Sequence, residues 1–161
     1  MSLINHRRRS DRWHGASQKV GQSAAPLFLD RIDIQCKITP VPFKGISKAA
    51  QGEPSAEIRK RVIRAREIQA ERFSGQKGIH CNAQMSERMI HQYAEPDEAG
   101  ISMLRMAMER LSLSARAYNR ILKVARTIAD LEGCEHVESH HLAEAIGYRT
   151  LDRGDWAERG I

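Results

Sequence analysis

The residues best suited to chemistry in this sequence are three cations spaced along one segment. Residues 114–131 read SARAYNRILKVARTIADL. At about 100° per residue on a helix, Arg116, Arg120 and Lys123 fall on one face and the aliphatic side chains on the other. Arginine has a planar fork of donors that matches phosphate oxygens, and Arg116 lies in the first turn, where backbone N–H groups favour anions. The row indicates either a phosphate-binding face or a solvated basic face.

Histidine and cysteine offer less specific patterns. His140 and His141 begin the last predicted helix, and we expect that adjacent helical residues, which point about 100° apart, do not easily chelate one ion together. His80 and Cys81 are isolated from other candidate ligands. We therefore expect core or surface histidines and no metal site. No Ser/His/Asp or Cys/His set of enzyme residues can be assembled either.

The elements that must position these side chains are predicted to be mainly α-helical. Residues 30–38 alternate apolar and polar side chains, which predicts one strand. About five helices follow, and they begin near Ser55, Ser86, Pro96, Ser114 and Ser139, with Ser55 and Ser139 expected as N-caps and Gly133 expected to end the fourth helix. Two of these helices are expected to turn the following residues inward: Ile58, Val62, Ala65 and Ile68 in the first, and Ile101, Met103, Leu104, Met106, Met108 and Leu111 in the third. The fold class is therefore a helical bundle preceded by one strand.

Charge and composition limit the classes of protein. The net charge is +6, but residues 1–25 hold five basic side chains and one acid, so most of it lies in a tail expected to have little fixed structure. No apolar run approaches the ~20 residues that span a bilayer, and no signal peptide is recognisable. Three cysteines, Cys36, Cys81 and Cys134, lie far apart without CxxC spacing, which favours a reducing cytoplasm over a disulfide framework.

Three stretches together resemble the magnesium-chelatase subunit I family, and its ComM/YifB-type competence branch in particular. They are PLFLDRIDIQ (26–35), GEPSAEIRKRVIRAREIQAERF (52–73) and LSLSARAYNRILKVARTIADLEG (111–133), and HLAEAIGYRTLDR (141–153) extends the likeness. The resemblance implies the C-terminal part of a ring-forming AAA+ ATPase. Its domains would be a basic tail (1–25), the edge of the α/β core (26–50), a helical lid (51–153) and a short tail (154–161).

The same resemblance implies roles for three arginines. Arg31 lies in the LDRIDI element, which would supply an arginine finger to the γ-phosphate of the neighbouring subunit. The alternative is that Arg31 only pairs with nearby aspartates. Arg116 lies in the SAR element, which is similar to the family's sensor-2 motif and would face the γ-phosphate from the lid, with Arg120 as a neighbouring support.

The sequence contains no G-x-x-x-x-G-K-[ST] phosphate loop, and no upstream apolar strand ends in paired acids for Mg²⁺. We therefore expect that this chain does not hydrolyse ATP by itself and holds no cofactor. ATP and Mg²⁺ are implied for the full-length protein, and so are an AAA+ core, neighbouring subunits of a hexameric ring and, for the competence branch, DNA. A free-standing basic helical module that binds nucleic acid is the alternative function.

Overall fold

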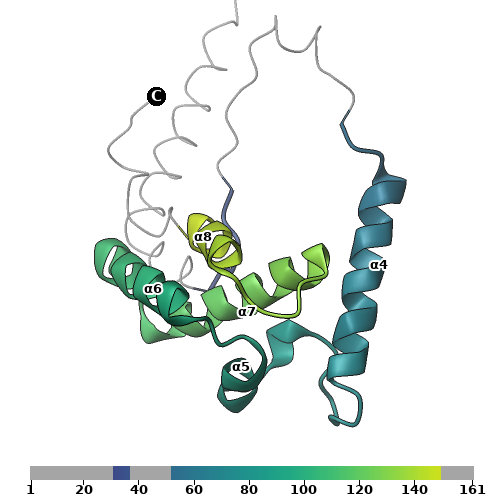
Figure 1. Cartoon of the computed structure of the whole chain (residues 1–161), viewed down its shortest axis with the longest axis horizontal. Helices are drawn as coiled ribbons and strands as arrows, with labels where there is room; N and C mark the ends of the chain where they lie inside the picture. The colour runs from purple at the N-terminus through teal and green to yellow at the C-terminus, as the bar shows by residue number, and fades with distance from the viewer. Residues whose placement is uncertain (1–30, 37–51, 150–161) are drawn as a thin grey trace, which may run out of the picture.

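The computed structural model describes residues 31–36 and 52–149, and the regular elements of these ranges are all helical (Figure 1). The prediction of a mainly α fold with about five helices is confirmed. The predicted tails, 1–25 and 154–161, lie outside the described residues, so the domain boundaries stay predictions. The elements are α4 (Ser55–Arg72), the 3-10 helix η1 (Asn82–Gln84), α5 (Glu87–Tyr93), α6 (Glu98–Leu111), α7 (Ala115–Glu132) and α8 (Ser139–Gly147).

Helix α7 is the central element of the fold. It packs against α4, η1, α5 and α8, while α6 packs against α8 (Figure 1). Its apolar sector supplies much of the core because five of the six side chains predicted to face inward are buried. These are Ile121, Leu122, Ala125, Ile128 and Ala129, and the sixth, Tyr118, packs against the core with its ring partly exposed.

Both ends of α7 are fixed by the residues that the sequence indicated. The Ser114 side chain accepts a hydrogen bond from the Ala117 N–H at 3.2 Å, which satisfies one of the free donors of the first turn. Gly133 ends the helix with φ = 77°, a left-handed conformation that a glycine adopts without steric cost. The boundaries of α7 therefore follow from local sequence chemistry.

Two predicted N-caps are wrong by one residue. Ser55 and Ser139 are the first helical residues of α4 and α8, and the caps are Pro54 and Glu138. In α8 a reciprocal pair of bonds replaces the expected serine cap, because the Glu138 carboxylate accepts the His141 N–H and the His141 ring accepts the Glu138 N–H. The histidine at the third helical position thus accepts the N-cap backbone N–H, which a glutamate or glutamine side chain usually accepts.

The prediction of a strand over residues 30–38 is wrong for the part that the structure describes. Residues 31–36 have no strand conformation, and Ile34, expected to point inward, is 52% exposed. The Gln35 N–H donates to the Tyr148 carbonyl at 3.1 Å, so this backbone joins the end of α8 and not another strand. A strand needs a partner strand to satisfy its ladder, and none lies within the described ranges.

Helix α4 meets α7 through its C-terminal half. Ala65 and Gln69 are buried there, whereas Ile58 and Val62, which continue the same apolar stripe, are 42% and 45% exposed. The Ser55 end extends past the other described helices (Figure 1). The prediction that Ile58 and Val62 face a core is therefore wrong within this structure, because no described element stands beside that half of the helix.

Helix α6 packs on α8 through a close approach at Gly100. A Cβ at this position would lie 2.7 Å from the Leu142 Cδ1 and 2.8 Å from the Pro96 Cβ, so a larger residue would force its neighbours to move. Leu104 is buried and Met103 packs against the core, as expected. Met106 is 64% exposed, so the prediction that it fills the core is wrong, because it lies on the outer face of α6. Among the described helices, none is both long and apolar enough to cross a membrane.

Candidate functional site

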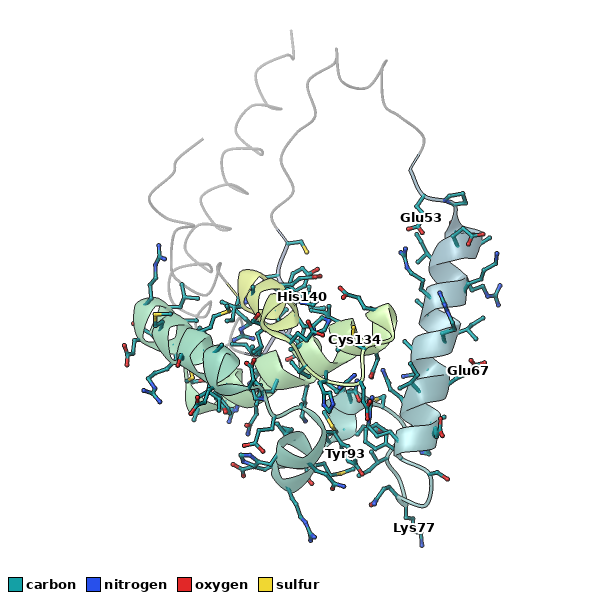
Figure 2. All side chains as sticks on the ribbon, viewed as in Figure 1. Glu53, Glu67, Lys77, Tyr93, Cys134 and His140 are labelled. Atoms are coloured by element: carbon teal, nitrogen blue, oxygen red, sulfur yellow. The ribbon has the colours of Figure 1, made fainter. Side chains whose placement is uncertain are left out.

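The cations predicted on one face of α7 do share a face, but their surroundings differ. Arg116 is exposed in the first turn, just after the Ser114 cap, and Arg120 and Lys123 are partly covered. Figure 2 shows side chains on the ribbon from α4 through α8 and the many charged groups at the surface. The three cations therefore differ in exposure and in surroundings.

Arg120 holds the segment 31–36 against α7. Its guanidinium lies 2.7 Å from the Asp33 carboxylate and donates also to the Arg31 carbonyl oxygen. The structure therefore brings together two of the three arginines singled out by sequence, since Arg120 binds the backbone of Arg31. The Arg31 residue itself is exposed. The local role of Arg120 here is to fix the position of residues 31–33.

Lys123 and Thr127 connect the same face of α7 to η1. The Lys123 ammonium donates to the Ala83 carbonyl at 2.9 Å. The Thr127 hydroxyl donates to the Lys123 carbonyl at 2.8 Å and accepts from the Asn82 amide at 3.1 Å. Arg120 and Lys123, two of the three cations of the predicted basic face, are thus bonded within the chain, which disfavours the interpretation of a uniformly solvated row.

Arg149, at the end of α8, is a second anchor for the segment 31–36 that the sequence analysis missed. It is 1% exposed, and its guanidinium donates to the Ile32 carbonyl at 2.5 Å. Arg120 on α7 and Arg149 just after α8 therefore hold neighbouring backbone carbonyls, those of Arg31 and Ile32. These two bonds fix the position of the Arg31 backbone relative to α7.

A buried polar centre around Asp130 joins α4, η1 and α7. The Asp130 carboxylate accepts from Arg72 at 2.5 and 2.8 Å, from the Asn82 amide at 2.7 Å and from the Gln69 amide at 3.3 Å. Arg126, one turn earlier on α7, donates to the same carboxylate at 3.1 Å. The Asp130 side chain is fully buried, so each bond acts where water does not compete.

Burial and hydrogen bonding oppose one another in this centre. Burial acts to raise the pKa of Asp130, but the bonds from Arg72 and Asn82 and the charge of Arg126 outweigh it, so the pKa lies below its usual range. Burial lowers the pKa of the Arg126 guanidinium, and the Asp130 charge partly offsets that change. The carboxylate is ionised, and the centre is a buried cluster of two guanidinium groups around one carboxylate.

Arg126 also fixes the loop that leaves α7. Its guanidinium donates to the Cys134 and Glu135 carbonyls, each at 2.6 Å. Neither Arg126 nor Asp130 was singled out by sequence, although both stand four residues apart at the edge of the apolar sector of α7. The available signal was the spacing of four residues between the arginine and the aspartate of ARTIAD. The same spacing is equally compatible with an exposed ion pair.

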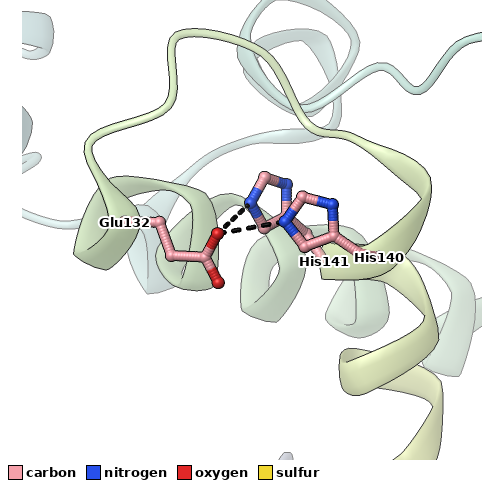
Figure 3. Close-up of side chains that lie close together, drawn as sticks. All are labelled: Glu132, His140 and His141. Carbon is pink, nitrogen blue, oxygen red and sulfur yellow. Dashed lines mark hydrogen bonds and ion pairs between the residues drawn. The ribbon is translucent and has the colours of Figure 1, made fainter.

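A histidine cluster joins the end of α7 to the start of α8 (Figure 3). The Glu132 Oε2 lies 3.0 Å from the His140 Nε2 and 3.1 Å from the His141 Nε2. The expectation of core or surface histidines holds for burial, since His141 is buried and His140 exposed. Both rings nevertheless reach one carboxylate oxygen, because Glu132 lies on another helix and faces the same side of the two rings (Figure 3).

Comparison with known proteins identifies the family. The family model described as "Magnesium chelatase, subunit ChlI C-terminal" matches residues 52–149, more than half of the chain. This chain belongs to that family. The matched range covers α4 to α8 and therefore both the basic face of α7 and the Asp130 centre.

Curated relatives extend the match beyond the helical part. The chain is 40% identical over 127 residues to the competence protein ComM of Haemophilus influenzae, with 78% of this chain and 24% of that protein covered. It is 43% identical over 128 residues to an uncharacterised protein, YifB, of Salmonella typhimurium, with the same coverage, and 38% identical to the Escherichia coli YifB protein. The chain spans about a quarter of the length of these relatives.

Proposed function

We propose that this member of the ChlI C-terminal family is the lid, or sensor-2 module, of an AAA+ ATPase, and that it couples the state of a bound nucleotide to the assembly of a ring. The observation that carries the proposal is the match over residues 52–149, which includes α7 with Arg116 exposed in its first turn. A guanidinium there stands beside the N-terminal end of a helix, where an anionic phosphate is favoured.

Arg116 would act as the sensor of the γ-phosphate. It would contribute a charge to a phosphate site whose P-loop and Mg²⁺ ligands belong to another part of the full-length protein. The rigid cap at Ser114 and the buried face of α7 keep this residue in a fixed relation to the rest of the helical unit. A change in what Arg116 binds would therefore move α4, α7 and α8 together.

Arg31 would act in trans as the arginine finger, with Arg120 as its support. The bond from Arg120 to the Arg31 carbonyl and the bond from Arg149 to the Ile32 carbonyl favour this assignment, because a finger must be held in position to act. Loss of such a finger costs about 10³–10⁵-fold in turnover in phosphoryl-transfer systems. In a hexameric ring, Arg31→Ala would have an effect of that order.

The likeness to the Haemophilus competence protein supports a cytoplasmic motor of the DNA-processing type, active in natural transformation through branch migration, over one that inserts Mg²⁺ into a porphyrin. The alternative, a free-standing module that binds nucleic acid, fits the structure less well. Arg120 and Lys123, two of the three cations in the proposed grip, already bind groups of the chain itself.

Titration of the intact chain distinguishes the two functions. A fluorescent ATP analogue with Mg²⁺ should not bind to the chain alone, and a fluorescent DNA duplex should bind weakly. A free-standing nucleic-acid module would instead bind the duplex tightly, with a log–log salt slope of about one unit per phosphate contacted. Tight nucleotide binding that Arg116→Ala abolishes would contradict the lid assignment, since the chain would then hold a complete phosphate site.

A further inference from the structure

The cluster of Glu132, His140 and His141 has a geometry that the proposed function does not use. One ligand atom from each residue lies within 4.8 Å of the others, and two helices supply them. Imidazole and carboxylate together suit zinc, copper and nickel better than magnesium or calcium. The hydrogen bonds around each group decide which of the three atoms is available to a cation.

His141 is committed to the helix cap. Its Nδ1 accepts the Glu138 N–H at 2.9 Å, so the ring proton must be on Nε2, and that N–H donates to the Glu132 Oε2. A cation on the His141 Nε2 would displace this proton and force Nδ1 to carry one against the Glu138 N–H. His141, buried, is therefore a donor that orients the Glu132 carboxylate and is not a metal ligand.

His140 has the opposite arrangement. Its Nε2 faces the Glu132 Oε2 at 3.0 Å, and its Nδ1 lies 3.5 Å from the Glu138 carboxylate. A ligating histidine usually donates its second ring N–H to a carboxylate, which fixes the tautomer and raises the basicity of the ligating nitrogen. Because the Glu132 carboxylate can only accept, the His140 Nε2–H donates to it when no cation is bound; a cation would take the place of that proton, and Nδ1 would then carry the ring proton toward Glu138.

We propose that Glu132 and His140 form a surface site for a divalent transition metal of the zinc type, with Glu138 and His141 as the groups that orient the two ligands. Bonds of about 2.1 Å at tetrahedral angles put two ligand atoms about 3.4 Å apart. The observed 3.0 Å between the His140 Nε2 and the Glu132 Oε2 is a few tenths of an ångström shorter. A cation would enter with small side-chain shifts, and waters would complete its coordination.

Access and charge also favour a cation at this position. The side chains of Glu132 and His140 are 45% and 54% exposed, so an ion has an open path from solvent. Glu132 is the last residue of α7, where the negative end of the helix dipole favours a positive charge. With two protein ligands the site would bind in the micromolar-to-millimolar range, and binding would tie α8 to the end of α7.

Calorimetric titration of the intact chain with Zn²⁺ tests the site. We expect one ion per chain, with affinity reduced at least tenfold in His140→Gln and in Glu132→Gln. Glu138→Gln, which keeps an oxygen for the cap, should weaken binding by about 10–100-fold, as outer ligands do. His136→Gln, an exposed histidine outside the cluster, should bind Zn²⁺ like the unchanged chain.

The protonation and metal binding of the ring nitrogens distinguish the proposed site from adventitious Zn²⁺ binding. In ¹⁵N-resolved spectra, added Zn²⁺ should shift the His140 Nε2 and leave His141 as the Nε2–H form. A shift of His141 to the Nδ1–H form would overturn the role given to that residue. Equal Zn²⁺ affinity in the unchanged chain and in both ligand variants would mean adventitious binding to thiols or other histidines. No heat of binding at millimolar Zn²⁺ would also overturn the proposal.

Discussion

Arg120 and Arg126 lie six residues apart on α7 and have opposite surroundings. Arg120 is partly exposed and holds a neighbouring segment through Asp33. Arg126 is 1% exposed and belongs to the ion cluster around Asp130. The comparison teaches that both halves of α7 use cations to hold other parts of the chain, the N-terminal half at the surface and the C-terminal half in a buried cluster. Helical periodicity alone does not separate the two uses.

The largest effect is expected where the buried cluster loses its acceptor. Asp130→Ala leaves Arg72 and Arg126 without their carboxylate in a buried site, and breaking such a cluster costs about 3–5 kcal/mol. Urea unfolding followed by circular dichroism measures the change. The matched control is Glu132→Ala, which removes a half-exposed carboxylate two residues later and should lower the free energy of unfolding less than Asp130→Ala does. Equal losses would break the comparison.

The next largest effect is expected on the free energy of unfolding at low pH. The folded chain holds the pKa of Asp130 below its unfolded value of about 3.9. Its contribution to stability is therefore complete above that unfolded value and is lost as the pH falls through the folded pKa. The free energy of unfolding of the unchanged chain should drop more steeply from about pH 5 downward than that of Asp130→Asn. Parallel pH profiles of the two proteins would contradict the account.

A smaller effect is expected at the opposite end of α7. Ser114→Ala removes the side chain that accepts the Ala117 N–H, and loss of such a cap costs about 1 kcal/mol. Thermal unfolding measures it, with Ser112→Ala as the matched control. Ser112 lies two residues earlier, where its left-handed backbone ends α6, and its side chain does not cap α7. A loss as large as that of Asp130→Ala would mean that both ends of α7 stabilise the fold equally.

The smallest effect on stability is expected for Arg120→Ala. Its bond to Asp33 is partly exposed, and exposed pairs contribute about 0–1 kcal/mol. The change should instead release residues 31–33, which amide NMR detects as shifts and faster hydrogen exchange at these positions. Lys123→Ala serves as the control because it contacts η1 and not this segment. Unchanged spectra at Asp33 in Arg120→Ala would contradict the role of Arg120 in anchoring residues 31–33.

The sequence predicted α7 and its ends because Ser114, Gly133 and the aliphatic period act locally. It predicted Arg116, Arg120 and Lys123 on one face for the same reason. Burial depends on neighbours distant in sequence, and this explains the misses. Val62 continues a regular apolar stripe but has no described helix beside it, and Asp130 is buried because Arg72, 58 residues earlier, returns to meet it. His140 and His141 share a partner only because Glu132, on another helix, lies beside both rings.

We propose that Arg116 senses the nucleotide that is bound elsewhere in a longer ATPase. The most direct measurement grafts residues 31–149 into the Haemophilus competence protein in place of its matching segment and follows ATP hydrolysis. We expect the graft to be active and Arg116→Ala to lower turnover by about a hundredfold, as loss of a donor to developing charge does. Arg64→Ala, an exposed arginine on α4, should hydrolyse ATP normally. Full activity of Arg116→Ala in an active graft would contradict the account.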